Sequence, residues 1–222
     1  MAREVVIYVH GLYSYRADSL ILRRRLAHGF GYDVHPFRYP ALSGSMAQIC
    51  ARLAQFVADQ PCETLHFIGH SLGGLVIYRF LERYPETAPG RVVFLGTPAV
   101  ASRTALAVGR SHWAALALGR CVTEELLTAH ERRWSSPRPL GIIAGTRRLG
   151  LGQFFGRIDE ENDGTIAVSE TRLPGATDHI TVAASHMGLL LSARVAQATA
   201  AFLREGRFSL APDQRFTSAR SP

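Results

Sequence analysis

The chain has 222 residues, of which 47% are hydrophobic and 19% are charged. This composition excludes an intrinsically disordered chain and is typical of a globular protein with one large domain or two small ones. The formal net charge is +7, and all 25 basic residues are arginine, which codon bias in a GC-rich genome explains. The arginines are scattered, with one run at Arg23–Arg25. This scattered distribution argues against nucleic-acid binding, which needs clustered basic residues. The positive net charge is compatible with peripheral contact with anionic surfaces.

The cysteines and the N-terminal residues bear on cofactors and location. Cys50, Cys62 and Cys121 do not have the spacing of metal ligands, and an odd number of cysteines cannot all pair. No signal peptide precedes the apolar stretch that begins at Glu4, and no uncharged apolar run has the length of a transmembrane helix. We therefore expect no metal, no transmembrane helix and a cytoplasmic location.

Short apolar segments alternate with helix-like segments along most of the chain. Strands are predicted at Glu4–Val9, Asp33–Tyr39, Thr64–Ile68, Arg91–Leu95, Leu140–Ala144 and His179–Ala184. Helices are predicted at Ser19–His28, Ser45–Gln60, Gly73–Tyr84, parts of Ala99–Trp134, and Ser192–Glu205. This alternation predicts a three-layer α/β fold, in which helices cover both faces of a mostly parallel sheet of about six strands. Binding sites of such sheets form at the carboxyl ends of the strands.

The stretch 97–138 is too long for a simple crossover between the fourth and fifth strands, and it contains the apolar run Trp113–Leu118. Two interpretations stay open. The stretch either forms a small lid or cap above the carboxyl end of the sheet, or it forms two helices packed against the sheet. The predicted organisation is one domain over residues 1–207, with the lid or cap in 97–138, and a polar C-terminal tail over 208–222.

The sequence Gly-His-Ser-Leu-Gly-Gly at 69–74 lies between a predicted strand and a predicted helix. Glycines on both sides of Ser71 permit a tight strand-to-helix turn, because a Cβ atom there would clash with neighbouring backbone. Such a turn brings the Ser71 hydroxyl to the carboxyl end of the sheet, next to the free N–H groups of a helix N-terminus. Ser71 is therefore predicted to be a nucleophile, and His70 beside it to be a packing residue.

A nucleophilic serine needs a base and a third group that orients this base. In a strand–serine–helix scaffold, the acid and then the histidine follow the serine along the chain. His186 follows the last predicted strand and is the predicted base, with a helix-capping role as the alternative. Asp163, in an Asn-Asp-Gly turn after the fifth strand, is the predicted acid. Asp159, Glu160 and Glu161 lie in the same acidic loop and stay alternatives.

An oxyanion hole needs two N–H donors that point at the developing negative charge. The first predicted donor is the backbone N–H of Leu72, directly after the nucleophile. The second is the backbone N–H of Leu12, in the loop after the first strand, where the sequence His10-Gly11 lets the loop fold over the serine. The His10 side chain itself is predicted to be structural.

Taken together, these motifs resemble an α/β-hydrolase, with a closer likeness to bacterial lipases and to the PGAP1-like group of lipase-like esterases. The segments that carry the resemblance are Val9–Gly11, Gly69–Gly74, Val93–Pro98, Asn162–Val168 and Ser185–His186, spread over residues 4–205. The resemblance implies a serine that is acylated by an ester and an acid that follows the penultimate strand. It also implies a minimal sheet, since the chain starts at the strand that carries the His-Gly sequence.

The predicted function is that of a lipase-like serine esterase that cleaves small acyl esters or lipids and needs no metal or organic cofactor. A serine at the turn, where dehalogenases and epoxide hydrolases have an aspartate, argues against those two reactions. Two alternatives stay open. One is a thioesterase or acyltransferase with the same three residues, and the other is a noncatalytic binding protein on a hydrolase scaffold.

Overall fold

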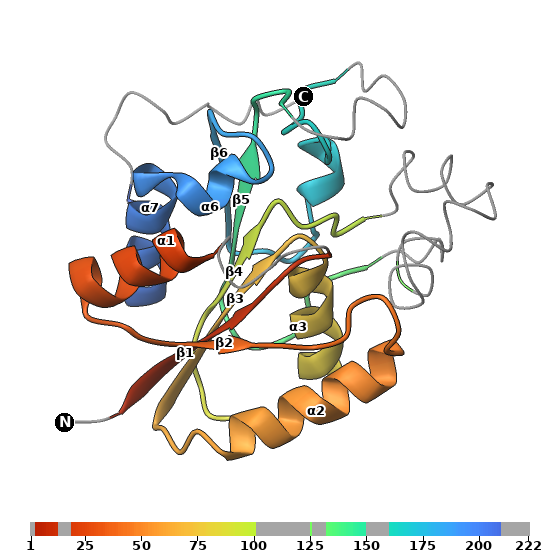
Figure 1. Cartoon of the computed structure of the whole chain (residues 1–222), viewed down its shortest axis with the longest axis vertical. Helices are drawn as coiled ribbons and strands as arrows, with labels where there is room; N and C mark the ends of the chain where they lie inside the picture. Colours follow the sequence, from red (N-terminus) through yellow and green to blue (C-terminus); the bar gives the residue numbers. More distant parts are fainter. Residues whose placement is uncertain (1–2, 13–18, 101–124, 126–131, 150–159, 210–222) are drawn as a thin grey trace.

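A six-stranded sheet forms the centre of the protein (Figure 1). The computed structural model describes residues 3–12, 19–100, 125, 132–149 and 160–209. The strands are β1 (Glu4–Val9), β2 (Asp33–Phe37), β3 (Thr64–His70), β4 (Val92–Leu95), β5 (Leu140–Gly145) and β6 (Asp178–Val182). They lie in the order β2-β1-β3-β4-β5-β6, and every neighbouring pair is parallel. The predicted parallel α/β sheet is thereby confirmed.

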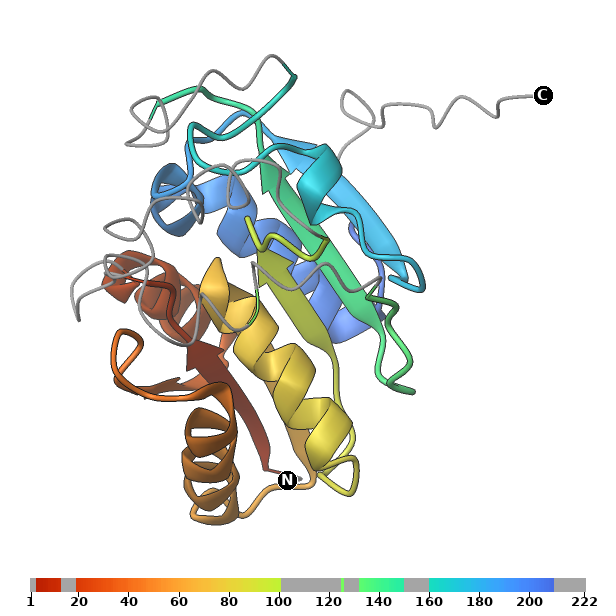
Figure 2. The ribbon, with the colours of Figure 1, turned by 90° about the vertical axis from the view of Figure 1, so that its right-hand side faces the viewer.

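Helices cover both faces of the sheet. They are α1 (Leu20–Arg24), which continues into the π-helical turn η1 (Arg25–Gly29), α2 (Met46–Ala58), α3 (Leu72–Arg83), α6 (Gly188–Leu191) and α7 (Ala193–Glu205), together with the 3₁₀ turn η3 (Ser169–Thr171). Helices α2 and α3 pack on one face, whereas α1 and α7 pack on the other (Figures 1 and 2). The structure therefore has the three layers that the sequence predicts.

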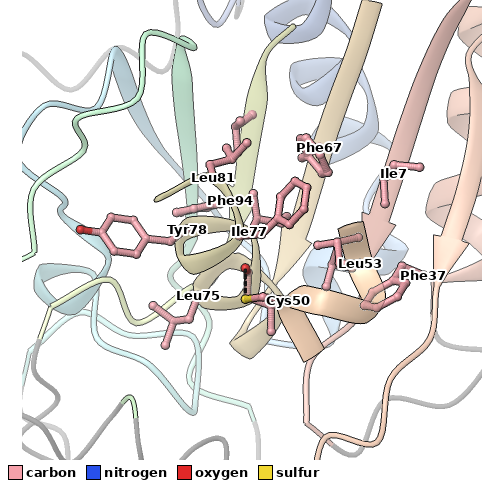
Figure 3. Packing of buried hydrophobic residues seen from close by; sticks show 14 of the residues in the cluster. Ile7, Phe37, Cys50, Leu53, Phe67, Leu75, Ile77, Tyr78, Leu81 and Phe94 are labelled. Atoms are coloured by element: carbon pink, nitrogen blue, oxygen red, sulfur yellow. Dashed lines mark hydrogen bonds between the residues drawn. The ribbon is translucent and has the colours of Figure 1, made fainter. Parts of the chain in front are cut away.

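Alternating side chains of the strands fill two separate cores. On β1, Val5 and Ile7 belong to the core under α2 and α3, and Val6 and Tyr8 belong to the core under α1 and α7. This arrangement follows from the two-residue period of a strand, and it explains why strands covered on both faces have continuous apolar sequences. Figure 3 shows the first core, in which side chains of α2 and α3 pack against those of the sheet.

The helix ends follow local sequence signals. Ser45 and Gln48 form a capping box at the start of α2, with each side chain bonded to the backbone N–H of the other residue. Ser192 accepts a hydrogen bond from Val195 N at the start of α7, and Gly206 ends that helix in the left-handed conformation. The Ser192 cap also separates α7 from the short α6, which the sequence does not predict as an element of its own.

Several predictions concern parts of the chain outside the described residues. Most of the stretch 97–138, including Trp113, is among them, so the lid or cap stays a prediction. The residues beyond 209 also lie outside the described part. Phe208 is buried against Phe202 of α7, with a distance of 4.8 Å between the ring centroids.

Candidate active site

Ser71 is the single residue between the end of β3 and the start of α3. Its φ of 53° and ψ of −124° make it the only residue other than glycine with a positive φ in the described part of the chain. Side chains of L-residues rarely adopt this conformation, and strained backbone of this kind costs about 1–3 kcal/mol. The turn is held by hydrogen bonds from Ser71 N to Leu95 O (2.9 Å) and from Gly74 N to Ser71 O (3.1 Å).

The glycines around Ser71 are required by close backbone approaches. A Cβ atom on Gly69 would lie 2.5 Å from Gly74 Cα, and a Cβ on Gly73 would lie 2.1 Å from the carbonyl oxygen of Val9. A Cβ on Gly74 would lie 2.2 Å from the hydroxyl of Thr97. These distances are shorter than any real Cβ contact, so β1, β3 and the first turn of α3 are packed directly against one another.

His186 lies between β6 and α6, where it contacts Asp163 in the loop that precedes η3. The Nδ1 atom of His186 is 2.7 Å from Oδ2 of Asp163, and the two side chains are 10% and 1% exposed. The backbone N–H of His186 also donates to the carbonyl of Asp163 at 2.8 Å. Since a carboxylate only accepts hydrogen bonds, the proton of the neutral imidazole is on Nδ1, and Nε2 is left as the proton acceptor.

The loop around Asp163 fixes the direction of its carboxylate. Oδ1 accepts hydrogen bonds from the N–H groups of Thr165 (2.9 Å) and Ile166 (2.7 Å), so Oδ2 is directed at His186. Asn162 supports the turn by accepting a hydrogen bond from Gly164 N, and Gly164 has the positive φ that the turn requires. Asp163 is therefore oriented by the Asn-Asp-Gly turn that the sequence singles out.

The other acidic residues of this loop differ in their surroundings. Glu160 and Glu161 are exposed, and Asp159 lies outside the described residues. Among the described acidic residues of the loop, Asp163 is the one whose side chain contacts His186.

The loop after β1 passes directly over the Ser71 turn. A Cβ atom on Gly11 would lie 2.9 Å from Cβ of Ser71, so Gly11 packs closely against the Ser71 side chain. The His10 ring stacks on Tyr39 at 4.4 Å between centroids, and burial lowers the pKa of His10. The Tyr39 hydroxyl donates to the His10 carbonyl at 2.7 Å. This loop carries Leu12, which is half-buried.

Tyr39 is a site residue that the sequence reasoning misses. Its partner His10 is 29 positions earlier in the chain. The available signal is its position just after the second predicted strand, at the edge of the sheet where the other site residues gather.

Comparisons with known proteins bear on the fold. No family model and no curated protein matches the sequence. The three-dimensional structure, in contrast, is similar to solved structures. The Bacillus licheniformis lipase BlEst2 in its propeptide form is 21% identical, with a TM-score of 0.64 over 85% of this chain and 47% of the lipase. The metagenomic carboxyl esterase MGS0156 is 20% identical, with a TM-score of 0.61 over 84% of this chain and 65% of the esterase. The type II thioesterase BorB of the borrelidin biosynthetic cluster is 15% identical, with a TM-score of 0.55 over 90% of this chain and 91% of the thioesterase.

The chain has the α/β-hydrolase fold. The fold predicted from the sequence is thereby confirmed, while membership of the superfamily and the closer likeness to bacterial lipases and PGAP1-like esterases stay predictions. This chain spans about half of the matched lipase and about two thirds of the matched esterase.

The α/β-hydrolase fold brings the predicted residues to one edge of the sheet. Ser71 follows β3, Asp163 follows β5 and His186 follows β6, all at the carboxyl ends of the parallel strands. Gly96, at the end of β4 between them, lies under the Asp163–His186 pair, since a Cβ on it would be 3.1 Å from both Oδ2 and Nδ1. The Ser71 hydroxyl makes no hydrogen bond to a described residue. The neighbouring residue His70 does contact the pair, since its ring lies against that of His186 with 4.7 Å between the centroids.

Other candidate binding features lie away from this edge. A groove of about 510 Å³ is lined by Leu65 at the start of β3, Tyr84 at the end of α3, and Cys62, and it therefore lies at the opposite end of the sheet from Ser71. Within the described ranges, no group of three or more His, Cys, Asp or Glu side chains is arranged to hold a metal ion. None of the described helices combines the length and apolar character needed to cross a membrane. The cytoplasmic location stays a prediction.

Proposed function

We propose that the protein is a serine hydrolase that cleaves carboxylic esters through an acyl-enzyme. The hydrogen bond between Asp163 and His186 is the observation that carries this proposal. A buried carboxylate that fixes an imidazole, at the same end of the sheet as a strained, half-buried serine, supports nucleophilic catalysis by that serine.

In the proposed reaction, the Ser71 hydroxyl attacks the ester carbonyl while Nε2 of His186 accepts its proton. The Asp163 carboxylate keeps the proton of the neutral imidazole on Nδ1 and stabilises the imidazolium that forms. The imidazolium then donates its proton to the leaving alcohol, and the acyl group stays on Ser71. A water molecule, deprotonated by His186, attacks the acyl-enzyme and releases the acid.

The N–H groups of Leu72 and Leu12 are the proposed oxyanion donors. Leu72 is the first residue of α3, so its N–H has no acceptor within the helix and lies at the positive end of the helix dipole. Leu12 follows Gly11, which touches Ser71, and the Tyr39–His10 hydrogen bond supports the loop that carries it. Such donors commonly contribute about 3–4 kcal/mol to the stabilisation of the transition state.

A thioesterase is the second candidate, since the similarity to the type II thioesterase BorB extends over nearly the whole of both chains. The same three residues serve either reaction, and they also serve an acyl transfer to an alcohol in place of water. The proposed substrate is a small acyl ester or a lipid, and peripheral contact with anionic surfaces is compatible with the net charge of +7.

A fluorophosphonate probe and a substrate panel test the proposal. The probe should label the wild-type protein and leave Ser71→Ala unlabelled. The panel should pair p-nitrophenyl esters with acyl thioesters of the same chain lengths. Higher kcat/KM on the esters would support the esterase, and higher kcat/KM on the thioesters would favour the second candidate. A wild-type protein that neither reacts with the probe nor hydrolyses any substrate would support a noncatalytic binding protein.

A further inference from the structure

His70 is fully buried beneath the proposed site, and its two ring nitrogens have different surroundings. Its Nε2 atom lies 3.1 Å from the backbone carbonyl oxygen of His186. Its Nδ1 atom has no hydrogen-bond partner among the described residues and faces Gly11. A carbonyl oxygen only accepts, so the proton of the His70 ring is on Nε2, and this N–H donates to His186.

The charge state of His70 is consistent with this single hydrogen bond. Burial, with a further contribution from the nearby His186 ring, lowers the pKa of His70 to about 3. The ring is therefore neutral at ordinary pH, and it presents one N–H group to the His186 carbonyl. A neutral ring in this position adds no positive charge next to the imidazole that is to accept a proton.

His186 is consequently held at three points. Asp163 binds its Nδ1–H at 2.7 Å and its backbone N–H at 2.8 Å, and His70 donates to its backbone carbonyl. The rings of His70 and His186 also touch, with 4.7 Å between their centroids. Both peptide groups of His186 and one side of its ring are therefore fixed.

His66, on the same strand, shows how a buried histidine differs when both of its ring nitrogens have hydrogen-bond partners. His66 is equally buried, but both of its nitrogens are paired, with Glu4 Oε1 at 2.6 Å and Arg91 N at 2.8 Å. At position 70, an apolar residue would fill the space without burying an Nδ1 atom that has no partner among the described residues, and burying such an atom is unfavourable. The imidazole at position 70 is thus disfavoured as a packing element, and what it adds over an apolar residue is its N–H group.

We propose that His70 is a positioning residue, whose Nε2–H group holds the backbone of His186 so that the His186 ring keeps its place between Ser71 and Asp163. The expected effect of His70 on kcat rests on the proposed function. The expected effect of His70 on the position of His186 rests on the contact between the two residues.

Two substitutions at the same position test it. His70→Phe keeps a ring of similar size and removes the N–H donor, and His70→Gln keeps an amide N–H donor at a similar reach. On the preferred ester, we expect His70→Phe to lower kcat by about tenfold to a hundredfold with KM within about twofold of wild type. His70→Gln should recover most of the lost kcat.

His66→Phe is the matched control. It removes a buried imidazole from the other end of the same strand and leaves Arg91 N without its acceptor. We expect it to lower the melting temperature and to leave kcat of the folded protein unchanged. If His70→Phe kept the wild-type kcat, or if His70→Gln and His70→Phe lost kcat equally, the positioning role would be wrong.

Proton NMR separates a failure of this inference from a failure of the proposed function. The Nδ1 proton of His186, bonded to Asp163, should give a downfield signal in the wild type that Asp163→Asn removes. We expect His70→Phe to broaden or shift this signal and His70→Gln to retain it, whether or not the protein hydrolyses esters. An unchanged signal in His70→Phe would overturn the inference, and a wild type inactive on every substrate would overturn the proposed function alone.

Discussion

Asp163 and His186 are joined by their side chains and by their backbones. The carboxylate accepts from the imidazole at 2.7 Å, and the Asp163 carbonyl accepts from the His186 backbone N–H at 2.8 Å. The loop after β5 and the loop after β6 are thereby connected at two points. Because the other carboxylate oxygen is occupied by two backbone donors, the carboxylate cannot turn away from the imidazole without breaking them.

Asp163→Asn tests the importance of this connection. The amide still fits the loop, but its NH₂ group can face Nδ1 and shift the ring proton to Nε2, which then cannot accept the serine proton. We expect kcat to fall by about four orders of magnitude with little change in KM. The matched control is Glu161→Gln in the same loop, whose exposed side chain should leave kcat unchanged. If Asp163→Asn kept the wild-type kcat and Glu161→Gln lost it, the acid would be Glu161.

The strained backbone of Ser71 predicts a stability difference between two inactive variants. Ser71→Ala and Ser71→Gly both remove the hydroxyl, but only alanine retains a Cβ atom at φ 53°. We expect Ser71→Gly to be the more stable variant by about 1 kcal/mol, because relief of strain exceeds the entropic cost of the glycine. Urea unfolding of both proteins measures the difference. Equal stabilities would mean that the turn is not strained.

Gly96→Ala should affect activity and stability together. The added Cβ would be 3.1 Å from atoms of both Asp163 and His186, at a residue with φ 55°. We expect the strained backbone to lower the free energy of unfolding by about 1–2 kcal/mol. We expect kcat to fall tenfold or more, which raises the activation barrier by at least about 1.4 kcal/mol. Gly206→Ala is the control, since its φ is 75° and its nearest neighbour is the flexible Arg91 side chain. It should lose stability and keep the wild-type kcat.

Buried histidines predict how stability changes with pH. Burial, as the largest cause, lowers the pKa of His179 to about 4, below the unfolded value of 6.5. The unfolded chain therefore binds more protons between pH 6.5 and 4, and the free energy of unfolding falls as pH is lowered through this window. The full contribution is present above pH 6.5.

His179→Gln keeps a donor for the Thr171 hydroxyl, which accepts from Nε2 of His179 at 2.9 Å. We expect the free energy of unfolding of the variant to fall less steeply with decreasing pH than that of the wild type. The two slopes should differ by about 1 kcal/mol per pH unit at most. Urea unfolding between pH 7 and pH 4 measures the two slopes. Parallel curves for the variant and the wild type would show that His179 has an ordinary pKa.

The sequence predicts the parts of the site that depend on short-range signals. Ser71 is recognised from the glycines on either side and from its position between a strand and a helix. Asp163 lies in a turn whose Asn-Asp-Gly sequence orients the carboxylate locally, although only the three-dimensional contact separates it from the nearby glutamates. The catalytic roles of these residues stay predictions.

Contacts between distant parts of the chain were not predictable in the same way. The His70 ring reaches a carbonyl 116 positions away, and the Tyr39 hydroxyl reaches one 29 positions away. Both contacts depend on the order of strands in the sheet and on the path of loops beyond them, which hydrophobic patterning does not define. The sequence therefore indicated that His70 was buried, but not that its N–H group was directed at His186.

The direct packing of β1 against α3 limits how this protein can change during evolution. A Cβ atom on Gly73 would lie 2.1 Å from the carbonyl oxygen of Val9, so a substitution there requires the end of the first strand and the Ser71 turn to move apart. The Ser71 turn and the end of β1 therefore form one packed unit, and substitutions that leave this unit intact must lie at residues outside these contacts.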